Sequence, residues 1–140
     1  MIKFENVSVT YPGGVEALKD LNLEIKDGDF IIIVGLSGAG KSTLLRTVNN
    51  LVKPSTGSVY LEGKNVTSAK KKELKKIRSQ IGMIFQTFNL VNRSTVLKNV
   101  LTGRLSNIST IRSILGLWPK DQKEMAFEAL NQVEILEKAY

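Results

Sequence analysis

The chain of 140 residues contains neither cysteine nor histidine. It therefore forms no disulfide, has no thiol for catalysis, and lacks the imidazole that usually serves as metal ligand or general base. No apolar run approaches the roughly 18 residues of a membrane span. Charged Lys3 and Glu5 stand where a secretory leader would be apolar. We expect a soluble, cytosolic, globular chain.

Hydrophobic residues, at 42%, suffice for a core. Acidic residues are scarce in residues 64–78. The net charge is +7, and residues 64–78 hold seven basic residues against one acid. Residues 121–140 are instead net negative. A solvated helix face is the favoured interpretation of the basic stretch, because no aromatic residue is interleaved with it. Nucleic acid or a phosphate-rich or anionic lipid neighbour are the alternatives, and no nucleic acid partner is expected.

Residues 35–43 read Gly-Leu-Ser-Gly-Ala-Gly-Lys-Ser-Thr. This sequence satisfies the phosphate-loop pattern of two glycines five residues apart, followed by lysine and a hydroxyl residue. An apolar run at 30–34 predicts a strand before it, and apolar residues at helical spacing predict a helix after it. The sequence therefore predicts a nucleotide-binding site, and a glycine-rich turn into an ordinary helix is the alternative.

The loop residues have distinct expected roles. Glycines let the backbone curl so that N–H groups converge on phosphate oxygens at a helix N-terminus. Lys41 supplies an ammonium to the β and γ phosphates, Ser42 a hydroxyl to Mg²⁺, and Thr43 a further hydrogen bond to phosphate. The residues expected to bind the nucleotide are Gly35, Ser37, Gly38, Ala39, Gly40, Lys41, Ser42 and Thr43.

Hydrophobic periodicity predicts that the chain changes from strand-rich to helix-rich near residue 90. We expect strands at 2–10, 18–25, 30–34, 59–61 and 81–85, with turns at 11–14 and 27–29. We expect helices after the glycine loop, at 70–79, around 96–101, within 108–117 and after Pro119. The fold class is thus α/β, with an antiparallel β portion ahead of a parallel one.

Several separate segments resemble the ATP-binding subunit of ABC transporters. They are Tyr11 before Pro-Gly-Gly, the loop at 35–43, Pro-Ser-Thr-Gly-Ser-Val at 54–59 and Ile-Gly-Met-Ile-Phe-Gln at 81–86. More narrowly, 99–105, 109–112 and 115–117 are similar to the phosphonate-import branch. The resemblance implies a P-loop NTPase with a RecA-like core. Residues 1–90 would form the N-terminal part of that ATP-binding core and 91–140 the beginning of a helical subdomain.

The same resemblance implies ATP and Mg²⁺ as cofactors and adds two residues to the site. Tyr11 would stack on adenine, although a tyrosine that only caps a strand end is the alternative. Gln86 would contact Mg²⁺ or the attacking water, unless it is merely a polar strand terminus. Lys41 and Gln86 are therefore the catalytic candidates, and Ser42 and Gln86 the metal ligands.

The resemblance also implies partners at the cytoplasmic face of a membrane. These are a membrane permease, a second copy of the subunit and, indirectly, a substrate-binding protein. The permease would dock against residues 87 to about 117. Candidates for that surface are Phe88, Leu90, Ile114 and Trp118, which could equally be core.

Three parts of the family pattern do not occur in these 140 residues: the Leu-Ser-Gly-Gly-Gln signature, the apolar strand ending in Asp-Glu, and the following histidine. We therefore expect the chain to stop before the signature and to bind nucleotide with little or no hydrolysis. The strand at 30–34 would then have an open edge. Importers for phosphate or amino acids, and a non-transport ABC ATPase acting on nucleic acid, are alternatives, whereas a P-loop kinase or GTPase is disfavoured.

Overall fold

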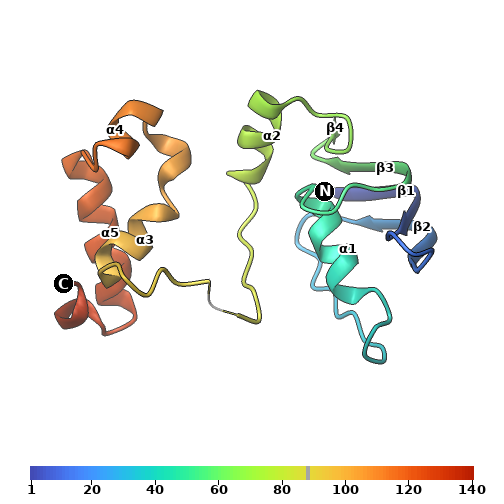
Figure 1. Ribbon diagram of the computed structural model, residues 1–140, viewed down its shortest axis with the longest axis horizontal. Helices are drawn as coiled ribbons and strands as arrows, with labels where there is room; N and C mark the ends of the chain where they lie inside the picture. Colours follow the sequence, from blue (N-terminus) through green and yellow to red (C-terminus); the bar gives the residue numbers. More distant parts are fainter. Residues whose placement is uncertain (88) are drawn as a thin grey trace. The chain divides into compact units, whose positions relative to one another are not determined.

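The computed structural model of the chain describes residues 1–87 and 89–140 (Figure 1). The chain divides into two compact units, Met1–Ile81 and Gly82–Tyr140. Each unit has its own cluster of buried hydrophobic side chains. The division into domains at residue 90 stays a prediction.

The first unit is built on a four-stranded antiparallel sheet in the order β2-β1-β3-β4 (Figure 1). Its strands are β1 (Ile2–Thr10), β2 (Glu16–Ile25), β3 (Thr56–Leu61) and β4 (Lys64–Asn65). Alternation of apolar and polar residues produces these strands, because it gives the sheet one buried face. The strands expected at 2–10, 18–25 and 59–61 are confirmed.

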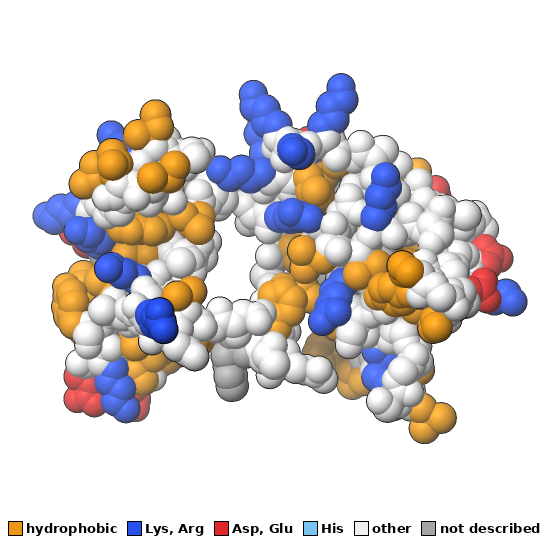
Figure 2. Space-filling model, viewed as in Figure 1, with side chains coloured by type: hydrophobic (Ala, Val, Ile, Leu, Met, Phe, Trp, Pro, Cys, Tyr) orange, Lys and Arg blue, Asp and Glu red, His pale blue; other side chains and the backbone are white. Residues whose placement is uncertain are grey.

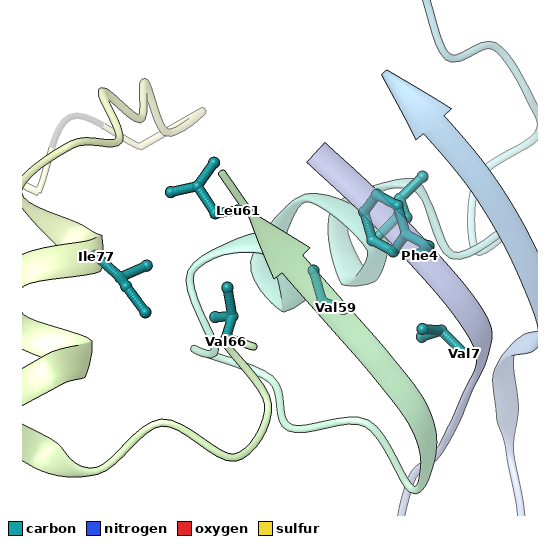
Figure 3. Packing of buried hydrophobic residues seen from close by; sticks show 7 residues of the cluster. Phe4, Val7, Val59, Leu61, Val66 and Ile77 are labelled. Carbon is teal, nitrogen blue, oxygen red and sulfur yellow. The ribbon is translucent and has the colours of Figure 1, made fainter. Parts of the chain in front are cut away.

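Helices α1 (Lys41–Val48) and α2 (Lys71–Arg78) accompany this sheet. Figure 3 shows side chains of β1, β3 and α2 gathered in one apolar cluster, where Ile77 of α2 is 1% exposed. The buried members of the cluster are Phe4, Val7, Leu44, Val59, Leu61, Val66 and Ile77. Both helices occur where the sequence predicts them.

Arg78 fixes the end of α2 to the end of α1. Its Nε donates to the carbonyl oxygen of Asn49 at 2.9 Å, and its Nη2 donates to that of Asn50 at 3.0 Å. The last carbonyl oxygens of a helix have no N–H donor within the helix. A guanidinium can supply the missing donors. Arg78 therefore has a structural role between two helices.

The second unit is helical. Its elements are α3 (Val96–Thr102), η1 (Leu105–Asn107), α4 (Thr110–Ile114), α5 (Lys120–Gln132) and η2 (Leu136–Lys138). Thr95 caps α3 by accepting from the backbone N–H of Lys98, and Pro119 stands at the start of α5. The core of this unit contains Leu97, Leu101, Ala126, Leu130 and Ala139. No helix within the described residues is both long and apolar enough to cross a bilayer.

The strands predicted at 30–34 and 81–85 are wrong: neither segment is a strand in the structure. Some of their side chains are largely in solvent, with Phe30 87%, Val34 86% and Ile84 98% exposed. Ile81 is partly buried against the core of the first unit. A buried parallel strand needs neighbours to accept its hydrogen bonds and cover its faces. Among residues 1–87 and 89–140, no strand of the sheet pairs with either segment. The parallel portion of the expected sheet is therefore not formed.

Candidate nucleotide-binding site

The glycine loop leads directly into α1. Gly40 precedes the helix with φ of 83° and ψ of 0°, and no side chain caps the helix end. The first N–H groups of a helix have no acceptor within the helix and carry its partial positive charge. They form a set of donors suited to an anion.

The loop lies against β2 at Gly40. A Cβ added at this residue would come within 2.1 Å of the backbone oxygen of Ala17. Gly38 shares the positive φ, at 82°, but a Cβ there would meet nothing within 4 Å. Glycine is thus required at 40 by both conformation and contact, and at 38 by conformation alone.

Lys41 folds back over its own loop. Its Nζ donates to the carbonyl oxygens of Gly35 and Leu36, each at 2.6 Å. Charge-assisted hydrogen bonds of this kind hold the lysine close to the backbone that the motif assigns to phosphate. The arrangement places one positive charge at the loop, as the sequence predicts. Neither carbonyl contact of Lys41 was predicted from the sequence.

Tyr11 reaches the loop through a hydrogen bond to Thr43. The Tyr11 Oη lies 3.1 Å from the Thr43 Oγ1, although the two residues are 32 positions apart in sequence. Thr43 is 7% exposed and Tyr11 38%. The ring therefore stands beside the loop with part of its surface open. Both residues are candidates from the sequence, but nothing in the sequence indicates that they are in contact.

Of the two residues predicted to bind metal, Ser42 is exposed at the first turn of α1. Gln86 is also exposed and belongs to the second unit, so its place in the site stays a prediction. Within the described part of the chain there is no group of three or more acidic side chains that could hold a metal ion.

The residues proposed to face a permease have different surroundings. Leu90 is 63% exposed and Ile114 80%. Trp118 is half-buried against the core of the second unit, so it has a packing role. Phe88 lies outside the described residues.

An α/β unit in which a glycine loop of this sequence opens a helix defines a P-loop NTPase. The ABC transporter family profile matches residues 18–140, and the chain belongs to that family.

Curated relatives and solved structures support this membership. The chain is 57% identical over all 140 residues to a phosphonates import ATP-binding protein, PhnC, of Bacillus thuringiensis subsp. konkukian, and covers 54% of it. It is 53% identical over its whole length to a protein of the same name from Lactobacillus johnsonii, covering 55% of it. The chain thus spans about half the length of the curated relatives it matches.

Two solved structures share the fold. The ATP-binding cassette MJ0796, in a dimeric post-hydrolysis state bound to ADP and Pi, matches with a TM-score of 0.80 at 37% identity. That match covers 96% of this chain and 57% of the cassette. CbiO1 from Clostridium perfringens, part of an ABC transporter complex, matches with a TM-score of 0.73 at 30% identity, covering 99% and 52%.

Proposed function

We propose that the chain binds ATP with Mg²⁺ at residues 35–43, as the ATP-binding subunit of an ABC importer. The observation that carries the proposal is the site itself: the Lys41 ammonium closes over the loop while Tyr11 is held at its side by Thr43. MJ0796, which shares this fold, is bound to ADP and Pi. That occupancy supports a nucleotide as the ligand.

Each residue of the site has a part in holding the nucleotide. The first N–H groups of α1 and the Lys41 ammonium bind the phosphates, which replace the loop carbonyls as partners of Nζ. Tyr11 offers its face to adenine. Ser42 would hold Mg²⁺, which would neutralise charge on the phosphates, and Gln86 would contact that ion or the attacking water.

We propose uptake of a small anion such as a phosphonate as the task of the complete subunit. The names of relatives 50% to 57% identical support this substrate. The partners would be a membrane permease, a second copy of the subunit and, indirectly, a substrate-binding protein, at the cytoplasmic face of the membrane. MJ0796 supports the second copy, because it is dimeric.

Phosphonate uptake by cells tests this proposal. Cells that depend on the full-length subunit should lose uptake when it carries Lys41→Ala and keep it with Lys53→Ala, which removes an equal charge from an exposed position. Uptake that survives Lys41→Ala contradicts the assignment. Normal phosphonate uptake after deletion of the subunit, with loss of phosphate or amino acid uptake, assigns another substrate.

We further propose that these 140 residues bind ATP without turning it over. They include the phosphate loop but neither the signature sequence nor the Asp-Glu strand end. Phosphoryl transfer to water needs Mg²⁺ held by an acid and an oriented nucleophile. Release of phosphate at about 1 per second or faster by the purified chain would contradict this.

A further inference from the structure

A second concentration of positive charge lies away from the glycine loop, in the first unit. Figure 2 shows Lys and Arg side chains gathered over α2 and β4. Beneath them is a cavity of about 420 Å³, which we call the lysine cavity. It is lined by Lys64, Lys70, Lys72, Glu73, Lys76 and Ile77.

The lysines of this cavity form no ion pair with an acidic side chain of the described residues. Among the described residues, ion pairs of lysine side chains are formed by Lys3, Lys19 and Lys120, and none by a lysine of the cavity. Glu73 is the one acid in the lining. Lys72 and Lys76 stand four residues apart on α2, a spacing at which like charges destabilise a helix. An anion between them would remove that repulsion.

The other basic side chains of α2 are placed differently. Arg78 is already bonded to the backbone of Asn49 and Asn50. Lys71 and Lys75 have the same four-residue spacing as Lys72 and Lys76, yet do not line the cavity. The helix therefore carries two equivalent lysine pairs, of which one faces a hollow.

We propose that the lysine cavity binds an anion carrying several phosphate groups, at a site separate from the glycine loop. Four ammonium groups provide up to twelve N–H donors, and phosphate oxygens are strong acceptors for them. The volume lies within the range of small-molecule pockets. Ile77, 1% exposed, gives the cavity a fixed floor because it belongs to the core of the unit.

A free polyphosphate and the headgroup of a phosphorylated phosphoinositide lipid share this chemistry. Single-stranded nucleic acid does not fit it as well, because binding of a single strand relies on aromatic side chains that stack on bases, and none lines the cavity. The extent of α2, eight residues, also limits the surface to a compact ligand.

The two lysine pairs provide a matched test. Binding of inorganic tripolyphosphate is measured by calorimetry on the whole chain with Lys41→Ala, which removes the ammonium of the glycine loop. Lys72→Gln/Lys76→Gln and Lys71→Gln/Lys75→Gln are added separately, and circular dichroism confirms that both keep their helices. Lysine and glutamine have similar helix propensities, so the variants differ mainly in which face loses charge.

We expect Lys72→Gln/Lys76→Gln to raise the dissociation constant about tenfold and Lys71→Gln/Lys75→Gln, outside the cavity, to change it less than about threefold. A second arm measures binding to vesicles of phosphatidylcholine with phosphatidylinositol bisphosphate, whose headgroup carries several phosphate groups, against pure phosphatidylcholine. If the chain binds the vesicles and only Lys72→Gln/Lys76→Gln weakens that binding, a lipid headgroup is the source of phosphate. If the chain binds tripolyphosphate but not the vesicles, the ligand is a free anion. The proposal is overturned if both double substitutions weaken binding equally, or if the chain binds neither tripolyphosphate nor the vesicles. Binding of poly(U) RNA that both double substitutions weaken equally also overturns it.

Discussion

At the scale of single residues, Gly40 and Gly38 separate two requirements on the loop. Both have a positive φ, but only Gly40 touches β2, through the backbone oxygen of Ala17. Gly38→Ala should cost about 1 to 2 kcal/mol, the strain of an L-residue in this conformation. Gly40→Ala should cost several kcal/mol because strain adds to overlap with an atom 2.1 Å away. Urea unfolding of the two variants measures the difference.

An equal loss of stability in both glycine variants would contradict this account. It would mean that the loop moves away from β2 at little cost, so that the contact with Ala17 does not hold it.

Tyr11 gives a second prediction at this scale, which separates its ring from its hydroxyl. Tyr11→Ala should weaken ATP binding by about 1 to 3 kcal/mol, because the adenine base loses its stacking partner, and should leave tripolyphosphate binding unchanged. Tyr11→Phe keeps the ring and loses the hydrogen bond to Thr43, at a cost of about 1 kcal/mol. Calorimetry with both ligands measures these changes. Equal weakening of ATP and tripolyphosphate by Tyr11→Ala would assign the tyrosine to strand capping alone.

Residues of the site could be predicted from the sequence where the motif is contiguous. The loop from Gly35 to Thr43 is read directly, because neighbouring residues supply both the backbone donors and the lysine. The contact of Tyr11 with Thr43 could not be read, since folding brings together residues 32 positions apart. The close approach of the Ala17 backbone oxygen to Gly40 could not be predicted from the sequence either, because every residue has a backbone carbonyl.

At the scale of elements, local patterns predicted what neighbouring residues decide. The periodicity of 3.6 residues located α1, and alternation located β1 and β2. The apolar runs at 30–34 and 81–85 carry an equally clear strand pattern and form no strand. A pattern records the preference of a segment, whereas a strand exists only with a partner for its backbone.

Packing of α5 gives a prediction at this scale. Leu130, 2% exposed, belongs to the core that α5 shares with α3, whereas Val133 at the end of α5 is 61% exposed. Leu130→Ala should destabilise the second unit by about 2 to 5 kcal/mol through lost burial and a cavity. Val133→Ala should change stability by no more than about 0.5 kcal/mol. Denaturation followed by Trp118 fluorescence reports on this unit, and equal effects of the two changes would contradict the packing.

At the scale of the whole molecule, the chain combines a sheet unit that carries the glycine loop with a helical unit that has its own core. Most of its net charge of +7 lies in residues 64–78, outside the loop. Each Lys→Ala substitution removes the same charge from the molecule. A difference between two such variants in ligand binding therefore reports on the position of the lysine. This gives the central claim a matched control.

The most direct test of the central claim is calorimetric titration of the chain with ATP in the presence and absence of Mg²⁺. We predict magnesium-dependent binding that Lys41→Ala weakens at least about tenfold, since a charge-assisted contact to phosphate contributes about 1.5 to 3 kcal/mol. Lys53→Ala, with the same loss of charge at an exposed position, should leave it unchanged. Absence of magnesium-dependent binding, or equal weakening by both variants, would contradict a nucleotide site at residues 35–43.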